Sequence, residues 1–195
     1  MKRVFLDLET QGTDPGKHGV WQVSGCVDLG GKPLQHFNFI LNPPEKYTWD
    51  ERAREMYLEQ KKIHGYDIER DGLPYKDFHQ RFTREILAGV DKFNKYDKFF
   101  LVGYNVTFDD RFLRALFADC GDDYYGSFFA WPAIDVAVLA AHHLGEERLR
   151  MANFKLGTVA QRFGIQMEES KLHDAAYDIE MTREIYLRLN GRNPS

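Results

Sequence analysis

Near the amino terminus the chain reads Arg-Val-Phe-Leu-Asp-Leu-Glu-Thr, residues 3–10. The apolar residues of this stretch favour a β-strand, and the segment 10–19, rich in Gly, Pro, Asp and Lys, predicts a loop. Side chains two positions apart on a strand point to the same face, so Asp7 and Glu9 lie side by side. Adjacent carboxylates repel each other, and a divalent cation that prefers oxygen ligands relieves this repulsion. The pair therefore indicates a Mg²⁺ or Mn²⁺ site or, alternatively, two carboxylates at an exposed strand end.

Outward from this strand, the hydrophobic pattern predicts further strands and helices. Residues 20–29 and 34–41 alternate as strands do, and Gly30-Gly31 between them is typical of a hairpin. Shorter apolar runs predict strands over 99–104 and 128–131. Helical spacing predicts helices over 50–63, through Phe78, Phe82, Ile86 and Val90, and over 109–119, 135–144, 156–163 and 174–189. This order predicts one α/β domain over residues 1–195. Its mixed sheet of five strands begins as an antiparallel meander and continues with parallel strands.

The composition is that of a soluble globular protein, with 43% hydrophobic and 29% charged residues. There is no apolar run of about 18 residues, and the first apolar stretch is too short for a signal peptide. The two cysteines, Cys26 and Cys120, form no disulfide or metal motif. We therefore expect no membrane partner, a cytoplasmic location, and both thiols as small core residues. The net charge of −4 argues against non-specific binding of long duplexes, because such binding rests on Lys and Arg.

Two later segments also carry carboxylates in suggestive positions. Residues 103–109 (Gly-Tyr-Asn-Val-Thr-Phe-Asp) follow an apolar strand and open a helix, a common place for ligands in α/β folds. Asp109 lies in the first turn of that helix, where it alternatively complements the helix dipole. Residues 173–178 (His-Asp-Ala-Ala-Tyr-Asp) place Asp178 about one turn into the last helix, with His173 just before it. The alternative for this segment is an ordinary helix start with Asp174 near its cap.

Taken together, the three segments resemble the DEDDh family of 3′→5′ exonucleases, which includes the proofreading subunit of bacterial replicative polymerase, ribonuclease T and oligoribonuclease. The matching stretches are FLDLET (5–10), GYNVTFDDRFL (103–113) and HDAAYD (173–178), and the resemblance extends from about residue 3 to residue 187. It implies an RNase H-like fold. It also implies an enzyme that hydrolyses phosphodiesters at nucleic-acid 3′ ends and releases nucleoside 5′-monophosphates.

The resemblance assigns a role to each of five residues. Asp7 bridges two divalent ions, Mg²⁺ or Mn²⁺. Glu9 and Asp178 hold the ion that carries the attacking water, and Asp109 supports the second ion. His173 is the general base, a role that suits an imidazole with an unperturbed pKa near 6.5. Two ions about 3.5–4 Å apart stabilise both the entering and the leaving oxygen of an in-line displacement.

The chain departs from the family pattern in places that bear on substrate contacts. Gln11 stands where the family often has Thr, Gln22 where it often has Glu, and Tyr104 where it commonly has His. Because the loop after the first Glu usually touches the terminal nucleotide, the candidate contacts are Thr10, Gln11, Asn105 and Phe108. The Phe108 ring, and Trp21 at the end of that loop, are suited to stacking on bases. For Phe108 the alternative is core packing.

Other functions explain the sequence less well. A phosphatase of the haloacid dehalogenase type would need Asp and Thr where Glu9 and Gln11 stand. A catalytically silent nucleic-acid-binding module of the same fold would be expected to have lost ligands, and all five positions are filled. A proofreading subunit that depends on a polymerase remains an alternative. The chain ends at Ser195, seventeen positions after Asp178, so we expect a stand-alone enzyme acting on single-stranded DNA or RNA ends. Its further partner would be a polymerase or a second copy.

Overall fold

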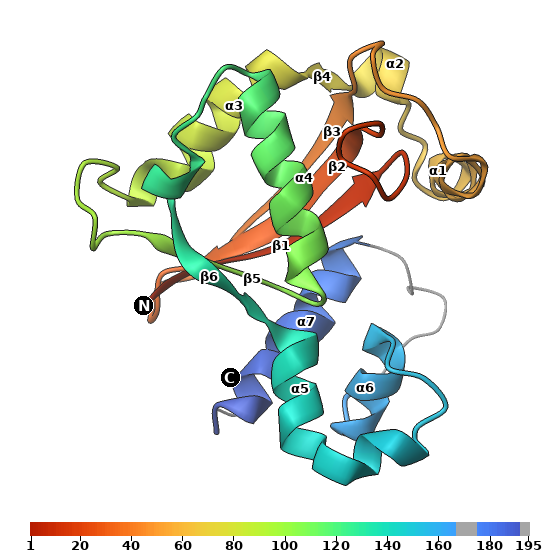
Figure 1. Cartoon of the computed structure of the whole chain (residues 1–195), viewed down its shortest axis with the longest axis vertical. Helices are drawn as coiled ribbons and strands as arrows, with labels where there is room; N and C mark the ends of the chain where they lie inside the picture. The colour runs from red at the N-terminus through yellow and green to blue at the C-terminus, as the bar shows by residue number, and fades with distance from the viewer. Residues whose placement is uncertain (167–174, 192–195) are drawn as a thin grey trace.

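A computed structural model describes residues 1–166 and 175–191 of the chain (Figure 1). Its strands are β1 (Lys2–Thr10), β2 (Val20–Asp28), β3 (Gln35–Asn42), β4 (Leu73–Pro74), β5 (Phe99–Gly103) and β6 (Phe129–Asp135). Its α-helices are α1 (Glu51–His64), α2 (Ile68–Asp71), α3 (Tyr75–Arg81), α4 (Val106–Asp119), α5 (Val136–Leu144), α6 (Leu156–Arg162) and α7 (Ala175–Leu189). Shorter helical turns are η1 (Phe82–Ile86), η2 (Leu87–Gly89), η3 (Tyr125–Ser127) and η4 (Gly145–Arg150).

The strands of the described chain form one mixed sheet in the order β4-β3-β2-β1-β5-β6. β1, β2 and β3 are antiparallel neighbours, whereas β5 and β6 pair in parallel on the other side of β1. The predicted meander followed by parallel strands is therefore confirmed. The sequence predicts five strands and does not indicate β4. This strand has two residues, Leu73 and Pro74, which pair with Leu41 and Asn42 of β3, so no local pattern marks it.

Helices cover both faces of the sheet, as Figure 1 shows for α3 and α4 on one side and α5, α6 and α7 on the other. The alternation of β1 supplies both cores. Val4, Leu6 and Leu8 pack in the cluster that contains the buried residues of α3 and α4. Phe5 points the other way, into the cluster formed with α5, α6 and α7. Odd-numbered residues of β1 therefore face α7.

The predicted long helix through Phe78, Phe82 and Ile86 is divided in the structure. It begins as α3, continues as a π-turn (η1) and ends as a 3₁₀ turn (η2). Four residues advance about 40° beyond one full turn of an α-helix, so a regular helix would carry every fourth side chain away from the core. The wider π-turn keeps all three residues buried. The Thr83 hydroxyl donates to the His79 carbonyl (2.7 Å), a contact that often bends helices.

The loop after β1 and the start of α1 close over the end of the sheet. The Asp50 N–H donates to the Gln11 carbonyl at 2.8 Å, which holds the two segments together. Trp21, the second residue of β2, is 1% exposed and packs edge-on against Tyr57 of α1 at 5.2 Å between ring centroids. The hypothesis that Trp21 stacks on bases is therefore wrong, because α1 covers this face of the strand.

Both cysteines agree with the expectation of small core thiols. Cys26 is buried and Cys120 is half-buried, and both are free thiols. Across residues 1–166 and 175–191, no helix combines the length and apolar character that a bilayer crossing requires.

Candidate active site

Asp7 and Glu9 lie on the face of β1 that α7 covers. Phe5, on the same face, packs edge-on against Tyr186 of α7 with 5.6 Å between ring centroids. Because side chains two positions apart share a face, Asp7 and Glu9 continue the row that Phe5 begins. Both are half-buried. The structure thus brings the first two predicted ligands together on one face.

Asp109 approaches the same strand from α4. It is 4% exposed, and its Oδ1 accepts a hydrogen bond from the Leu8 N–H at 3.0 Å. Leu8 stands between Asp7 and Glu9 in the chain, so this bond fastens the second acidic segment to the first. Asp109 also lies in the first turn of α4, so complementing the helix dipole is compatible with its position.

Asp178 lies on α7, four residues into the described helix, and is half-buried. Its negative charge acts on both carboxylates of β1, raising the pKa of Glu9 and the pKa of Asp7. β1, α4 and α7 therefore bring four of the five predicted catalytic residues into one region. The fifth, His173, lies outside the described residues.

The carboxylates of this region share an excess of negative charge. Burial first, and then the charges of Asp109, Glu9 and Asp178, raise the pKa of Asp7 well above its usual range. Burial, followed by the charge of Asp178, raises the pKa of Glu9 to about 7. Burial likewise raises the pKa of Asp109 to about 8, against the opposing hydrogen bond from Leu8. Among the described residues, neither Asp7, Glu9 nor Asp109 forms an ion pair with Lys or Arg.

This donor set fits a hard divalent cation. Carboxylate oxygens are the ligands that Mg²⁺ and Mn²⁺ prefer, and a bound cation would offset the unbalanced charge. Within the described part of the chain, no three Asp, Glu, His or Cys side chains converge closely enough to hold one ion. Coordination of one ion by three of these groups would therefore require their side chains to rotate toward it.

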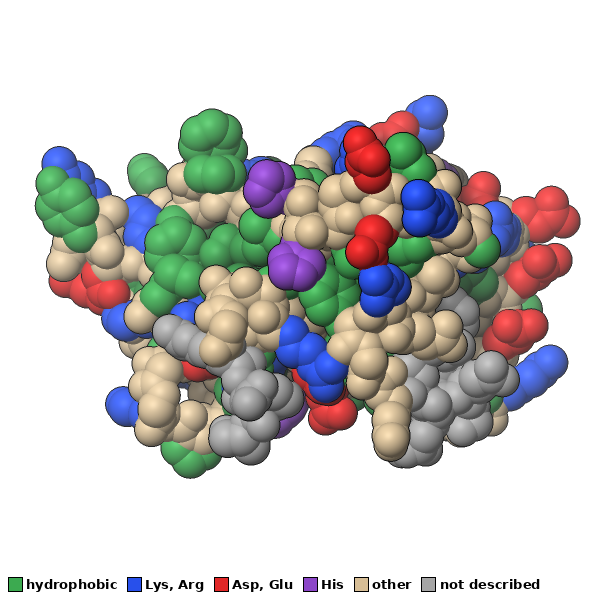
Figure 2. All heavy atoms as spheres, turned by 90° about the horizontal axis from the view of Figure 1, so that it is seen from below, with side chains coloured by type: hydrophobic (Ala, Val, Ile, Leu, Met, Phe, Trp, Pro, Cys, Tyr) green, Lys and Arg blue, Asp and Glu red, His purple; other side chains and the backbone are tan. Residues whose placement is uncertain are grey.

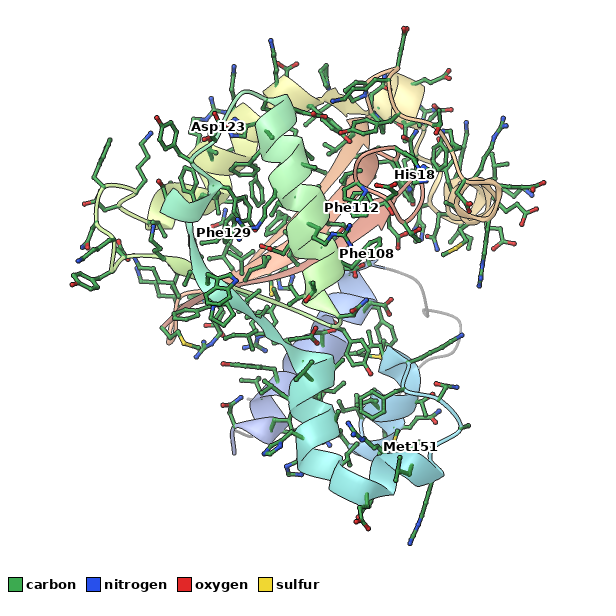
Figure 3. The ribbon with its side chains drawn as sticks, viewed as in Figure 1. His18, Phe108, Phe112, Asp123, Phe129 and Met151 are labelled. Carbon is green, nitrogen blue, oxygen red and sulfur yellow. The ribbon has the colours of Figure 1, made fainter. Side chains whose placement is uncertain are left out.

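A hollow of about 300 Å³ lies beside Glu9. Its walls come from the end of β1, the following loop, α1 and α4, and include Glu9, Thr10, Thr13, Arg52, Met56 and Phe108. Figure 3 shows Phe108 and Phe112 projecting from α4 toward the loop that carries His18. The Phe108 ring packs against Phe112 at 4.8 Å and remains half-buried. One side of the Phe108 ring thus packs in the core and another lines the hollow, so its position is compatible with both core packing and base stacking.

The other predicted substrate contacts differ in their surroundings. Thr10 lines the hollow, and its hydroxyl donates to the Gly12 carbonyl at 2.6 Å. Gln11 is 5% exposed, and its Oε1 accepts from the Gly19 N–H at 3.0 Å, so its side chain braces the loop from inside. Asn105 is exposed and holds a left-handed backbone conformation (φ 61°). Such a conformation costs on the order of 1–3 kcal/mol and often marks a functional position.

The contribution of α1 to this hollow is not indicated by the sequence. Arg52 and Met56 line the hollow beside Glu9, although they lie more than forty positions further along the chain. The pattern of residues 50–63 predicts a helix but gives no sign of the surface that the helix covers. The Asp135 carboxylate caps α5 by accepting from the N–H groups of Ala137 (2.9 Å) and Val138 (3.3 Å).

The chain is similar over nearly its full length to known nucleases, although no family model matches it. Ribonuclease T of Hahella chejuensis is 33% identical over 194 residues, which cover 97% of this chain and 83% of that protein. The DNA polymerase III subunit epsilon of Rickettsia prowazekii is 26% identical over 200 residues, covering 100% of this chain and 76% of that subunit. A solved structure of Escherichia coli exonuclease I with a 5cy-dT13 oligonucleotide superposes with a TM-score of 0.70 at 21% identity. The superposition covers 99% of this chain and 41% of the exonuclease I chain, and it bears on the fold alone.

The RNase H-like fold and these relatives define a hydrolase that acts on nucleic acids. The chain belongs to the DEDDh (DnaQ-like) family of 3′→5′ exonucleases and is a metal-dependent 3′→5′ exonuclease.

Proposed function

We propose that this exonuclease releases nucleoside 5′-monophosphates one at a time from the 3′ ends of single-stranded nucleic acids, without a polymerase partner. The observation that carries the proposal is the gathering of carboxylates from β1, α4 and α7 beside a hollow of about 300 Å³. The hollow opens next to Glu9, so a strand end that enters it brings its last phosphodiester to the carboxylates. The acidic net charge of −4 favours short contacts with one strand over long duplex tracts.

Asp7, Glu9, Asp109 and Asp178 are the residues that would hold two Mg²⁺ or Mn²⁺ ions. When bound, such ions stabilise the charge that develops on the phosphate oxygens during hydrolysis. We assign His173 as the general base that takes a proton from the attacking water, a contribution typically worth about 10²–10⁴-fold in rate. The product then leaves with its phosphate on the 5′ oxygen.

The hollow beside Glu9 takes the 3′-terminal nucleoside. Phe108 and Met56 supply apolar surface for the base from opposite helices, and Arg52 supplies a positive charge for the adjoining phosphate. Thr10 and Asn105 provide polar groups at the edge. We assign Gln11 to positioning the loop rather than touching the substrate, because its amide carbonyl is already bonded to Gly19.

Two free thiols and the absence of a bilayer-crossing helix in the described residues agree with our proposal that the enzyme works in the cytoplasm. Among the similar proteins, one is named a ribonuclease and another a DNA polymerase subunit. RNA and DNA strands are therefore both substrates to be tested.

The test compares the wild type with Asp178→Asn on matched 3′-labelled and 5′-labelled single strands of DNA and RNA, with Mg²⁺, Mn²⁺ or EDTA. We expect stepwise shortening from the 3′ end with either ion, none with EDTA, and a loss of at least about 100-fold in the variant. Asp123→Asn is the matched control and should behave as wild type, because this exposed carboxylate lies beyond the C-terminal end of α4, whereas Asp109 lies in the first turn of that helix. Cleavage that begins only when a polymerase is added would contradict the stand-alone proposal. Binding without cleavage under any condition would indicate a silent module.

A further inference from the structure

The loop between η2 and β5 has a repeated composition that the exonuclease site does not use. Residues 91–99 read Asp-Lys-Phe, Asn-Lys-Tyr and Asp-Lys-Phe, so an acid or amide, a lysine and an aromatic residue recur three times. The first two repeats form the exposed loop, and the third leads into β5, which begins at Phe99. We refer to residues 91–98 as the aromatic–lysine loop.

Hydrogen bonds give the first two repeats the same local structure. The Asp91 Oδ1 accepts from the Phe93 N–H, and the Asn94 Oδ1 accepts from the Tyr96 N–H, each at 3.0 Å. The backbone N–H of Asn94 donates to the Asp91 carbonyl (2.9 Å), and that of Asp97 donates to the Asn94 carbonyl (3.0 Å). Two equivalent turns therefore follow each other, and Phe93 and Tyr96 occupy equivalent positions on them.

Both aromatic rings of the loop face solvent. Phe93 is 89% exposed and Tyr96 is 85% exposed. The ammonium of Lys92 lies 5.3 Å from the Phe93 centroid, and that of Lys95 lies 4.8 Å from the Tyr96 centroid. These lysines leave most of each ring uncovered, so each repeat presents an open aromatic surface next to a positive charge.

The charges around the loop leave these two lysines available. Asp97 pairs with Lys2 at 2.5 Å, and Asp91 accepts the Phe93 N–H described above. Within the described residues, Lys92 and Lys95 form no ion pair. Figure 2 shows hydrophobic and basic side chains next to each other at its left end, where Figure 1 places this loop, with acidic side chains beside them.

A hollow of about 370 Å³ adjoins the loop. Phe93 and Phe128 contribute aromatic surface to its lining, and Lys92 contributes a positive charge. The lining also includes Asp91 and Arg84, and Arg84 pairs with Glu85 at 2.8 Å. Flat apolar surface combined with cations suits a nucleobase and its phosphate better than it suits an apolar protein segment.

We infer that the aromatic–lysine loop is a second contact for single-stranded nucleic acid, in which bases stack on Phe93 and Tyr96 while Lys92 and Lys95 neutralise phosphates. The loop lies at the end of β5 where Phe99 pairs with Lys2, five residues before Asp7 on β1. At about 3.4 Å per residue of β-strand, the five residue steps of β1 from Lys2 to Asp7 span about 17 Å. The inference rests on the proposed single-stranded substrate, and it places this contact upstream of the nucleotide that is removed.

The experiment measures equilibrium binding of fluorescent single strands in EDTA, where hydrolysis is absent. One strand has about 20 nucleotides and the other has three. Phe93→Ser/Tyr96→Ser should weaken binding of the long strand about tenfold or more, because each stacked base contributes substantially, and should leave the short strand unchanged. Lys92→Gln/Lys95→Gln should lower the slope of log K against log salt by about 1.4, since each single-strand phosphate contact contributes about 0.7.

Matched controls are Leu149→Ser, which removes another apolar side chain that is 79% exposed, and Lys62→Gln on the exposed part of α1. Neither should change the affinity or the slope. Long-strand affinity equal to wild type in both loop variants would overturn the inference, and loss of self-association in the same variants would assign the loop to a protein contact instead. A wild type that binds the long strand but never shortens it with metal would contradict the proposed function and leave the second contact standing.

Discussion

The hydrogen bond from the Leu8 N–H to Asp109 is the contact that joins two acidic segments about one hundred positions apart. The donor is the backbone N–H between Asp7 and Glu9, so the position of the Asp109 carboxylate depends on β1, which carries Asp7 and Glu9. Asp109 is also nearly inaccessible, and burial rather than any single neighbour dominates the rise in its pKa. At the scale of single residues, the site is therefore a set of carboxyl groups whose charged forms the fold disfavours.

Replacing Asp7 by Asn should separate catalysis from folding. The amide keeps the shape of the side chain but loses the charge that would bind both ions, so we expect kcat on a labelled single strand with Mg²⁺ to fall by at least about 100-fold. The melting temperature of the metal-free variant should equal or exceed that of the wild type, because one of several repelling charges is gone. Asp123→Asn should change neither quantity. A wild-type rate in Asp7→Asn would show that the metal assignment is wrong.

At the scale of elements, Asp135 links α5 to the turn that opens α4. Its Oδ1 accepts from Ala137 and Val138 at the start of α5 and also from the Asn105 N–H at 3.2 Å. Asn105 is the N-cap residue of α4, and its side chain makes no capping hydrogen bond. The hydrogen bond to Asp135 therefore helps to hold the left-handed backbone conformation of Asn105. The Asp135 side chain therefore both caps the N-terminus of α5 and holds Asn105, a candidate substrate contact.

We expect Asp135→Ala to lower the free energy of unfolding by about 1 kcal/mol, the typical loss for an N-cap. Because the Asn105 turn loosens as well, KM for a single strand should rise more than kcat falls. Urea denaturation and steady-state kinetics measure the two effects. Asp135→Asn keeps an acceptor oxygen and should retain most of the stability. Equal stability of the Ala variant and the wild type would show that the cap contributes nothing.

At the scale of the whole molecule, the site makes stability depend on pH and metal. The pKa of Asp109 is about 8 and that of Glu9 about 7 in the folded protein, above the usual values near 4 in the unfolded chain. Below about pH 4 both carboxyl groups are protonated in the folded and in the unfolded protein, so their raised pKa values do not lower the stability. As the pH rises toward 8, these carboxyl groups ionise readily in the unfolded chain but not in the folded protein, so the free energy of unfolding falls progressively. The fall is complete above the pKa values of the folded protein.

The metal-free protein should therefore lose stability between about pH 5 and pH 8, measured as the urea midpoint in EDTA. Asp109→Asn should flatten this dependence, because the amide keeps an acceptor for Leu8 without a titrating group, whereas Asp123→Asn should not. Adding Mg²⁺ should raise the melting temperature more at pH 8 than at pH 5, since ligands must be deprotonated to bind it. Stability that rises steadily with pH in EDTA would contradict the assigned pKa shifts.

Much of this protein follows from local sequence patterns. The alternation of β1 places Asp7 and Glu9 on one face, because the period of a strand is two residues whatever surrounds it. The helix over residues 136–144 and the cap at Asp135 follow equally from local spacing and side-chain chemistry. The three acidic segments also suffice to recognise the family, and the order of the predicted strands and helices suffices to predict a mixed sheet. These features depend on contacts within a few residues, or on a pattern of residues that the sequence displays directly.

The remaining features were decided by contacts between distant segments. Residues 50–63 predict a helix, but only the folded chain shows that α1 buries Trp21 and lines the hollow with Arg52 and Met56. Gln11 looks polar and exposed in the sequence, and it is buried because its carbonyl bonds the Gly19 N–H. The same holds for β4, which exists only by pairing with β3. The sequence by itself determined the fold class and the carboxylates on β1, whereas the tertiary structure decided what surrounds them, because burial and charge repulsion depend on neighbours that no local pattern encodes.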